Sequence, residues 1–285
     1  MNPSGSTNLI CLLGSPVSHS ISPQMHNTAF DALGLDFSYM AFDVDKTNLK
    51  TAVNGLKVLN AKGFNLTMPL KTAIIPLLDD IDDAAKLANS VNTCVYENGR
   101  LKGYSTDGIG FLESMTDSNI EYVGKTITML GAGGAATAIV AQAALEGVKK
   151  INILKRKNAS FAATEDFADL LTKSTECDVM VYDINDSNIM KFCLEESDIL
   201  INGTNVGMGD DDTSLVPIDF LYPELTVCDV IYHPPETKLL REAKSVGCKT
   251  MNGKYMLLYQ GAAAFKLWTG KDMPIELIKA SCFDI

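Results

Sequence analysis

The sequence has no long apolar run. None approaches the roughly 20 residues that a membrane-spanning helix needs, although apolar residues make up 46% of the 285 positions. The first residues, MNPSGSTN, hold no basic segment that leads into an apolar one, which is the pattern of a secretory signal. We therefore expect a cytoplasmic protein that has no part in a membrane.

Paired cysteines are also missing. The seven cysteines are spread singly, without a C-x-x-C pair, and most lie in apolar runs such as LICLLG and LTVCDVIY. We therefore expect reduced and mostly buried thiols rather than a disulfide framework.

Basic residues are few, 24 against 35 acidic ones, which gives a net charge of −11. This charge opposes general attraction to nucleic acid, so an anionic ligand must be held by local groups. Of the three histidines, His19 and His26 are seven residues apart and lack the one-turn spacing and the nearby acid of a helical zinc site. We expect no metal.

What is present is an alternation of strand-like and helix-like segments, typical of α/β folds with parallel sheets. Two helical segments, AATAIVAQAALEG and TKLLREAKSVG, each end at a glycine suited to the position after a helix. ENGR indicates a hairpin turn between two short strands. The predicted strands cover residues 9–14, 37–44, 63–68, 126–130, 151–155, 179–184, 198–203 and 225–232.

The length suits two domains. Asp107 and Gly108 lead into a predicted helix, and we place the crossing from a first to a second α/β domain at residues 105–110. The pattern leaves open which domain receives the last helices, KYMLLYQGAAAFKLW and PIELIKAS.

A strand, TITML, runs directly into Gly131-x-Gly133-x-x-Ala136 and a helix. This context predicts a dinucleotide site: Gly131 permits the tight turn, Gly133 lets the backbone approach a pyrophosphate, and Ala136 allows close helix packing. The alternative is a tight turn without a ligand.

The next strand ends about 20 to 25 residues further on, where an acid normally binds the ribose of NAD. Here stand Lys155, Arg156, Lys157 and Asn158. Cations without an acid favour the 2′-phosphate of NADP, unless these lysines are solvated surface charge.

HSISPQMHN, residues 19–27, follows a buried strand and has three readings: a metal site, a helix cap or a small-molecule clamp. Ser22 and Pro23 suit the N-cap and first position of a helix, which leaves Ser20 unexplained. Further along, Thr67 ends a strand, and Lys71 follows a proline suited to a first helical turn. Lys71 and Asp107 form a plausible acid/base pair for reducing a carbonyl, although a surface lysine is the simpler reading of Lys71 alone.

Eight motifs in order extend over nearly the whole chain: GSPVSHSISPQMHN, GFNLTMPLK, VNTC, GYSTDGIG, GAGGAATA, NGTNVGM, DVIYHPPETKLL and NGKYMLLYQGAAAFKLWTG. Together they resemble the shikimate dehydrogenase family, and the C-terminal segments most resemble its quinate/shikimate branch.

The resemblance implies roles for particular residues. Lys71 would be the acid/base residue, paired with Asp107. The other substrate-binding residues would be Ser20 and Ser22 at the carboxylate, Thr67, Asn92, Asp107 and Gln260 at the ring hydroxyls, and Tyr232 at the border of the site. The cofactor-binding residues would be Gly131, Ala132, Gly133, Gly134, Ala135, Lys155, Arg156, Lys157, Asn158, Asn205, Ile231 and Gly253.

The resemblance to this family also implies a fold of two domains with a cleft between them. Residues 1–108, completed by helices in 254–285, would form an α/β catalytic domain, and residues 109–253 a Rossmann-type NAD(P)-binding domain. The implied activity is the reversible reduction of 3-dehydroshikimate to shikimate, a step of aromatic amino acid biosynthesis, with NADP or NAD in a monomer or homodimer. Quinate as a main substrate is the first alternative, and a non-catalytic nucleotide-sensing protein is a remote one.

The chain departs from the family pattern, or from that of the quinate/shikimate branch, at three positions. Ser105 replaces a usual Asn, while Asn158 and Asn205 replace an Asp and a Lys of the quinate/shikimate branch. Thr67 resembles the shikimate-specific enzymes, whereas the quinate-using branch often has Ser. One extra methyl discriminates between substrates by only about 1 to 3 kcal/mol, so the substrate preference stays open. The cofactor preference stays open because Asn158 and Asn205 both fall in the cofactor region.

Overall fold

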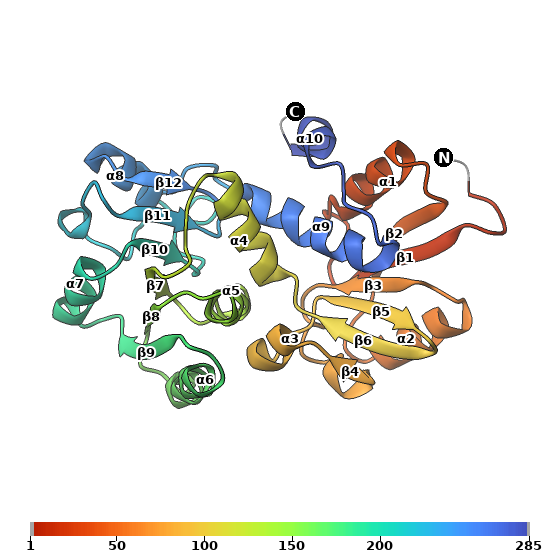
Figure 1. Cartoon of the computed structure of the whole chain (residues 1–285), viewed down its shortest axis with the longest axis horizontal. Coiled ribbons are helices and arrows are strands. Elements are labelled where there is room, and N and C mark those ends of the chain that lie inside the picture. Colours follow the sequence, from red (N-terminus) through yellow and green to blue (C-terminus); the bar gives the residue numbers. More distant parts are fainter. Residues whose placement is uncertain (1–2, 284–285) are drawn as a thin grey trace. The chain divides into compact units, whose positions relative to one another are not determined.

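The computed structural model describes residues 3–283 of the 285-residue chain. Contacts between residues divide it into two compact units (Figure 1). The first unit runs to Thr106 and resumes at Leu258, and the second is the continuous segment Asp107–Leu257.

The first unit is built on a six-stranded sheet of mixed direction, in the order β2-β1-β3-β5-β6-β4. β1 pairs in parallel with β2 and β3, whereas the hairpin predicted at ENGR forms β5 and β6 and makes β3–β5 and β5–β6 antiparallel. The expected parallel pairing is present at β1–β2, β1–β3 and β4–β6 but not at the strands of the hairpin, because a short hairpin joins only antiparallel strands. The strands are β1 (Asn8–Gly14), β2 (Phe37–Asp43), β3 (Gly63–Leu66), β4 (Asp80–Ile81), β5 (Thr93–Glu97) and β6 (Arg100–Tyr104).

Helices from both ends of the chain pack on this sheet. Trp268 of α9 donates its indole N–H to the carbonyl of Cys94 at 3.0 Å, and Phe265 stacks on Phe30 of α1 with ring centroids 5.1 Å apart. The C-terminal segment thereby completes a core begun by the first hundred residues. The helices are α1 (Ser22–Ala32), α2 (Leu49–Val58), the 3₁₀ turn η1 (Ile75–Leu77), α3 (Asp83–Ala88), α9 (Lys254–Thr269), α10 (Ile275–Ile278) and the π-helical turn η3 (Lys279–Phe283).

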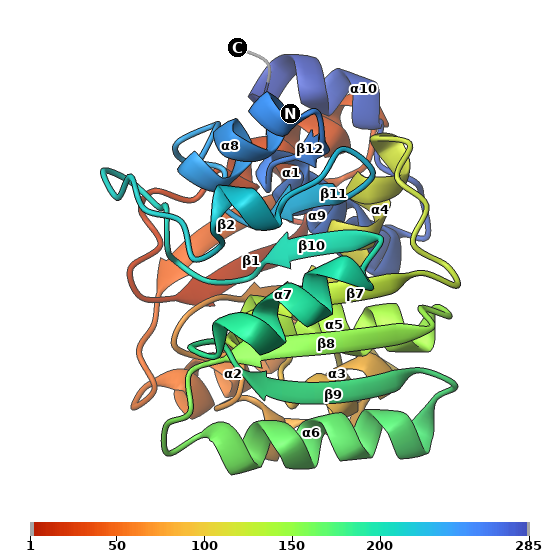
Figure 2. The ribbon, with the colours of Figure 1, turned by 90° about the vertical axis from the view of Figure 1, so that its left-hand side faces the viewer.

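The second unit holds a six-stranded sheet that is parallel throughout, in the order β12-β11-β10-β7-β8-β9 (Figure 2). Numbered within the unit, the order is 6-5-4-1-2-3, that of a Rossmann-type dinucleotide-binding fold. The strand order reverses between β7 and β10, and ligands of such sheets bind beyond the carboxyl ends of the strands at that point. The strands are β7 (Thr126–Leu130), β8 (Lys150–Lys155), β9 (Asp178–Asp183), β10 (Ile199–Asn202), β11 (Thr226–Asp229) and β12 (Lys249–Met251).

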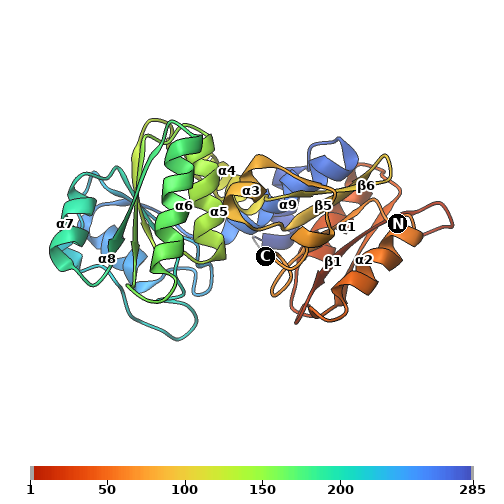
Figure 3. The same cartoon turned by 90° about the horizontal axis from the view of Figure 1, so that it is seen from below.

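Helices cover both faces of this sheet, with α4, α5 and α6 on one side and α7 and α8 on the other (Figure 3). α8 ends at Gly247, which adopts the left-handed conformation expected of a glycine after a helix. The helices are α4 (Asp107–Asp117), α5 (Gly134–Leu145), α6 (Phe161–Ser174), α7 (Ser187–Glu195), the 3₁₀ turn η2 (Ile218–Phe220) and α8 (Lys238–Val246).

Each strand whose range was predicted from the sequence is present, and no end is shifted by more than three residues. β4 and β12 were not predicted, because two or three residues are too short to show a period. Within residues 3–283, no helix combines the length and the apolar character that crossing a membrane requires.

Candidate functional site

The segment HSISPQMHN begins α1, but its cap differs from the prediction. Ser22 is the first helical residue rather than the N-cap, Ile21 precedes it without a side-chain cap, and Pro23 takes the second position. The backbone N–H of Ser22 instead donates to the hydroxyl oxygen of Ser20 at 3.2 Å. Because that oxygen acts as the acceptor, the hydroxyl proton of Ser20 stays available to a ligand.

A chain of buried polar residues runs from Tyr39 to Thr93 in the first unit. The Tyr39 hydroxyl donates to Asn65 Oδ1 at 2.8 Å. Asn65 in turn donates to Thr93 Oγ1 at 2.9 Å. Asn65 was missed as a functional support, although a polar residue within the apolar GFNLTM segment was a usable signal, since buried polar groups must find partners.

Asn92 and Gln260 lie together in the first unit although 168 residues separate them. Asn92 Nδ2 donates to Gln260 Oε1 at 3.4 Å and to Thr106 Oγ1 at 2.9 Å, while Asn92 Oδ1 accepts the Thr106 N–H at 2.7 Å. Two residues assigned to the ring hydroxyls are thus brought into contact, and Thr106 fixes the chain directly before Asp107.

Thr67 directly follows β3, as predicted, and its N–H donates to Leu13 O at 2.9 Å. Lys71 lies in a series of turns, so the helix that the proline before it suggested does not form. Pro76 provides no N–H with which an α-helix could continue, and only the short turn η1 forms. The carbonyl of Lys71 accepts the N–H of Val91 at 2.9 Å. Asp107 is buried as the first residue of α4, in the other unit, so its pairing with Lys71 stays a prediction.

His26 faces the interior of the first unit. Its ring lies against Tyr39, with centroids 4.5 Å apart, and against Trp268 and Phe265 of α9. Neither ring nitrogen has a hydrogen-bond partner, and burial lowers the pKa of His26 to about 3. His26 therefore serves packing as a neutral ring. His19 is exposed, and residues 3–283 contain no cluster of three or more His, Cys, Asp or Glu side chains suited to a metal ion.

In the second unit, the glycine-rich loop follows β7 at the point where the strand order reverses. Gly131 has φ +89°, and a Cβ there would lie 2.7 Å from Thr204 Cγ2. Gly133 is the N-cap of α5 without a side-chain cap, and a Cβ at Gly133 or Gly134 would meet no atom within 4 Å. The first turn of α5 thus presents N–H groups to open space without an acidic side chain, which suits a pyrophosphate.

The neighbouring residues complete this loop. Ala132 and Ala135 are half-buried, whereas Ala136 is 1% exposed. A Cβ at Gly203, just after β10, would come within 2.7 Å of Ala136 Cβ, so α5 packs closely against that strand end. This close packing is what the glycine–alanine pattern predicts.

The three cations at the end of β8 are not equivalent, contrary to the prediction. Lys155 is buried, and its ammonium donates to Ser160 O, Ser160 Oγ and Thr164 Oγ1 at 2.7 to 3.0 Å. All three of its donors are used at Ser160, the N-cap of α6, and at Thr164, so Lys155 is not available to a phosphate in this arrangement. Arg156 and Lys157 are exposed, and Asn158 Oδ1 accepts from Ser160 N–H and Oγ–H.

The remaining candidate residues lie in three loops at the carboxyl ends of β10, β11 and β12. Asn205 and Tyr232 are exposed, whereas Ile231 is buried. Gly253 N–H donates to Ile231 O at 3.0 Å, and any Cβ at Gly253 would collide with the carbonyl of Val230. The strand order therefore gathers Asn205, Ile231, Tyr232 and Gly253 at one edge of the sheet.

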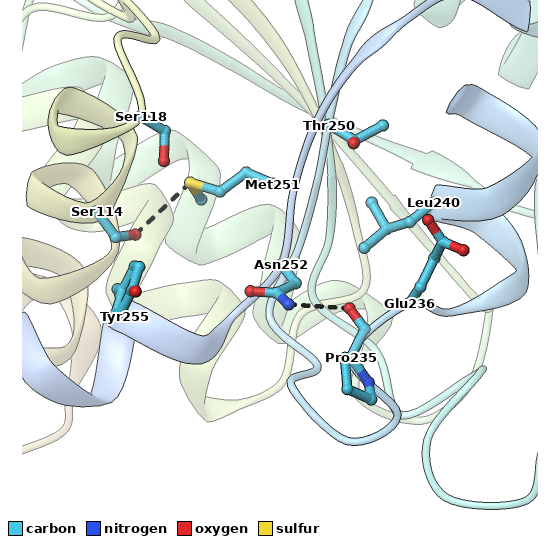
Figure 4. Close-up of a pocket in the computed structure, with 9 residues that line it drawn as sticks. All are labelled: Ser114, Ser118, Pro235, Glu236, Leu240, Thr250, Met251, Asn252 and Tyr255. Atoms are coloured by element: carbon cyan, nitrogen blue, oxygen red, sulfur yellow. Dashed lines mark hydrogen bonds between the residues drawn. The ribbon is translucent and has the colours of Figure 1, made fainter. Parts of the chain in front are cut away.

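A separate pocket of about 290 Å³ opens in the second unit beside these loops (Figure 4). Ser114 of α4, Met251, Asn252 and Tyr255 contribute to its wall. None of the residues predicted to bind substrate or cofactor lines this pocket.

Comparisons with known proteins give a consistent result. A family model described as the shikimate dehydrogenase substrate binding domain matches residues 12–94, and one described as the shikimate 5′-dehydrogenase C-terminal domain matches residues 255–283. A curated relative from Alkaliphilus metalliredigens, named shikimate dehydrogenase (NADP(+)), is 50% identical over 279 residues, which cover 97% of this chain and 96% of the relative.

Solved structures agree. Shikimate 5-dehydrogenase from Listeria monocytogenes, in complex with shikimate and NAD, is 44% identical with a TM-score of 0.96 and 99% coverage of both chains. Quinate dehydrogenase from Corynebacterium glutamicum, in complex with NAD, is 27% identical with a TM-score of 0.87, covering 98% of this chain and 99% of its own. The chain therefore belongs to the shikimate dehydrogenase family.

Proposed function

We propose that this protein catalyses the reversible, NAD(P)-dependent reduction of 3-dehydroshikimate to shikimate. The observation that carries the proposal is the contact between Asn92 and Gln260, which joins two predicted substrate residues from distant parts of the chain. The 50% identity to a shikimate dehydrogenase (NADP(+)) over nearly the full length supports it.

The residues present fit a dinucleotide. The backbone from Gly131 to Ala135 and the start of α5 would hold its pyrophosphate, since the space beside Gly133 and Gly134 is open. Arg156 and Lys157 are the exposed cations that would face a 2′-phosphate. When bound, the nicotinamide supplies or accepts the hydride.

Lys71 would transfer the proton. In reduction its ammonium donates a hydrogen bond and then a proton to the carbonyl oxygen, and in oxidation the neutral amine takes the proton of the C3 hydroxyl. Asp107 would orient that ammonium and stabilise its charge. Such general acid–base catalysis contributes about 10²- to 10⁴-fold to rate.

The substrate carboxylate would be held by neutral donors in this chain of net charge −11. Ser20 keeps a free hydroxyl proton while its oxygen accepts from Ser22 N–H. Ser22 is buried at the start of α1 and its N–H is held by Ser20, so the backbone of the two serines is set before a ligand arrives. Both hydroxyl groups would donate to the carboxylate. Thr67, Asn92 and Gln260 would then bind the ring hydroxyls, with Tyr232 at the border.

Quinate is the second candidate substrate, because a quinate dehydrogenase shares the fold at 27% identity. Thr67 favours shikimate, since its methyl group leaves less room for the extra hydroxyl of quinate than serine would. We further propose that the protein acts in the cytoplasm as a monomer or homodimer and binds neither nucleic acid nor membranes.

The test measures the change in absorbance at 340 nm in four assays, which combine shikimate or quinate with NADP or NAD. We expect a clear preference for shikimate. A higher kcat/KM for quinate would make quinate the substrate, and no absorbance change in any combination would leave a non-catalytic nucleotide-sensing protein.

The role of Lys71 is tested by Lys71→Ala. We expect kcat to fall by about 10²- to 10⁴-fold, while calorimetry gives nearly the wild-type affinity for the dinucleotide. Lys50→Ala, on the exposed surface of α2, is the matched control and should keep wild-type turnover. Turnover retained by Lys71→Ala would remove Lys71 from the mechanism.

A further inference from the structure

Asp229, the last residue of β11, is a fully buried carboxylate to which the sequence analysis gave no role. Its Oδ1 accepts the N–H of Ile231 at 2.9 Å and Nδ2 of Asn202 at 3.1 Å. Its Oδ2 accepts the hydroxyl of Thr237 at 2.8 Å. All three neighbours donate to it, which is the pattern expected around an ionised carboxylate.

The partners of Asp229 are buried as deeply. Thr237, at 1% exposure, is also the N-cap of α8. Asn202, at 2% exposure, accepts both the N–H and the hydroxyl of Thr204 on its Oδ1, at 3.1 and 2.7 Å. One carboxylate therefore connects the loop after β10, the loop after β11 and the start of α8.

The loop after β12 joins the same set of bonds. Gly253 N–H donates to Ile231 O, and Asn252 Nδ2 donates to Pro235 O at 2.9 Å (Figure 4). Val230 N–H donates to Asn202 O at 3.0 Å. The backbone at Val230 and Ile231 is thus held from both sides, and Asp229 supplies the only carboxylate among these bonds.

These loops carry the residues that the proposed function places at the reacting end of the cofactor and at the border of the substrate: Asn205, Ile231, Tyr232 and Gly253. We infer that Asp229 is a positioning residue: without touching substrate or cofactor, its carboxylate sets the loop Val230–Thr237 in the conformation that catalysis needs. The inference rests on the proposed function.

A carboxylate accepts at all three positions, whereas the amide of Asn would turn an N–H toward one of them. Ile231 N–H and Asn202 Nδ2 can only donate, and the Thr237 hydroxyl would have to reverse and accept. Asp229→Asn keeps the shape of the side chain and changes only that chemistry. Thr237→Val removes one donor, again without changing the shape, and leaves the other two bonds of Asp229 in place. Thr237→Ser keeps the hydroxyl.

The decisive experiment compares Thr237→Val, Thr237→Ser and Asp229→Asn with a control that loses only a helix cap. Asp186→Ala is that control, because Asp186 caps α7 through the N–H groups of Asn188 and Ile189, away from the three loops. Each variant is measured for kcat, for the KM of shikimate, for ADP affinity and for melting temperature. ADP probes only the end of the cofactor expected at Gly131–Ala135.

We expect Thr237→Val and Asp229→Asn to lower kcat at least tenfold while ADP affinity changes less than threefold. Thr237→Ser should restore kcat to within threefold of wild type. Asp186→Ala should melt earlier, as Thr237→Val does, but keep wild-type kcat. Hydrogen exchange should show faster exchange at the amides of Ile231 and Gly253 in Thr237→Val and Asp229→Asn alone.

Two results would overturn the inference: wild-type kcat in Thr237→Val, or an equal loss of kcat in Asp186→Ala. If Asp229→Asn does not fold, the Thr237 pair still decides. A wild-type protein without turnover would refute the proposed function instead. In that case, unchanged amide exchange at Ile231 and Gly253 in Thr237→Val and Asp229→Asn would separately refute the positioning by Asp229.

Discussion

At the scale of single residues, the imidazole of His26 lies among aromatic rings with no partner for either nitrogen. Its pKa is about 3 in the folded chain against 6.5 for an exposed histidine. Between these two values the unfolded chain binds a proton that the folded chain does not. Stability from this residue is therefore complete above pH 6.5 and is lost as the pH falls below it.

The prediction is that acidification from pH 7.5 to 5 lowers the free energy of unfolding by about 2 kcal/mol through His26 alone. His26→Phe should lose about 2 kcal/mol less than wild type over this range, because a phenyl ring binds no proton. Urea unfolding at both pH values gives the difference, with exposed His19→Gln as the control. Equal pH dependence in wild type and His26→Phe would show that His26 is protonated in the folded protein.

The sequence predicted where a residue lies in the fold better than it predicted which residues its side chain contacts. The motif around Gly131 indicated its turn correctly, because a glycine at positive φ between a strand and a helix leaves few conformations. Lys155 could not be assigned in the same way. Its ammonium contacts Ser160 and Thr164 only when the start of α6 packs against the end of β8. The spacing of these residues in the sequence does not predict that contact.

At the scale of elements, the loop from β7 to α5 separates two uses of glycine. Gly131 has φ +89° and lies against Thr204, so its absent side chain is needed for folding. Gly134 is the first residue of α5, and a Cβ there would meet no other atom of the protein. The lack of a side chain at Gly134 therefore matters only for a ligand that binds there.

We predict opposite outcomes for alanine at these two positions. Gly131→Ala should lower the free energy of unfolding by about 1 to 3 kcal/mol, because alanine is strained at that φ. Gly134→Ala should keep or slightly raise stability, since alanine favours a helix, yet lower dinucleotide affinity at least tenfold. Denaturant titration and calorimetry measure the two quantities, and Gly55→Ala in α2, also in open space, should leave affinity unchanged. Full affinity in Gly134→Ala would place the pyrophosphate elsewhere.

Strands were the elements best predicted, because buried parallel strands form continuous apolar runs. Helix beginnings were predicted less well. At α1 the sequence favoured Ser22 as the cap, whereas Ser22 is the first helical residue and donates its N–H to Ser20 Oγ, two residues earlier. The N-cap position falls on Ile21, whose side chain has no hydrogen-bond acceptor, so capping preference did not set the start of this helix.

At the scale of the whole molecule, the two units differ in continuity. The sheet of the second unit is complete within Asp107–Leu257, whereas the core of the first requires residues beyond Leu258. The single tryptophan of the chain, Trp268, lies in that returning segment and is 8% exposed.

We therefore predict that residues 107–257 fold alone and that residues 1–106 do not. A peptide of residues 254–285 added to residues 1–106 should restore a cooperative melting transition and shift the emission of Trp268 to the blue as the indole becomes buried. Phe265→Ala in the peptide should weaken the association, because it removes the stacking on Phe30. Cooperative unfolding of residues 1–106 without the peptide would contradict the prediction.

The return of α9 to the first unit has a consequence for biosynthesis. A ribosome releases a chain from its N-terminus, and N-terminal domains usually fold first for that reason. Here β1 to β6 leave the ribosome early but must wait for Phe265 and Trp268, among the last residues to emerge. The middle of the chain thus completes its fold before the beginning does, and the apolar surface of the early strands is the part of the nascent protein that a chaperone would need to shield.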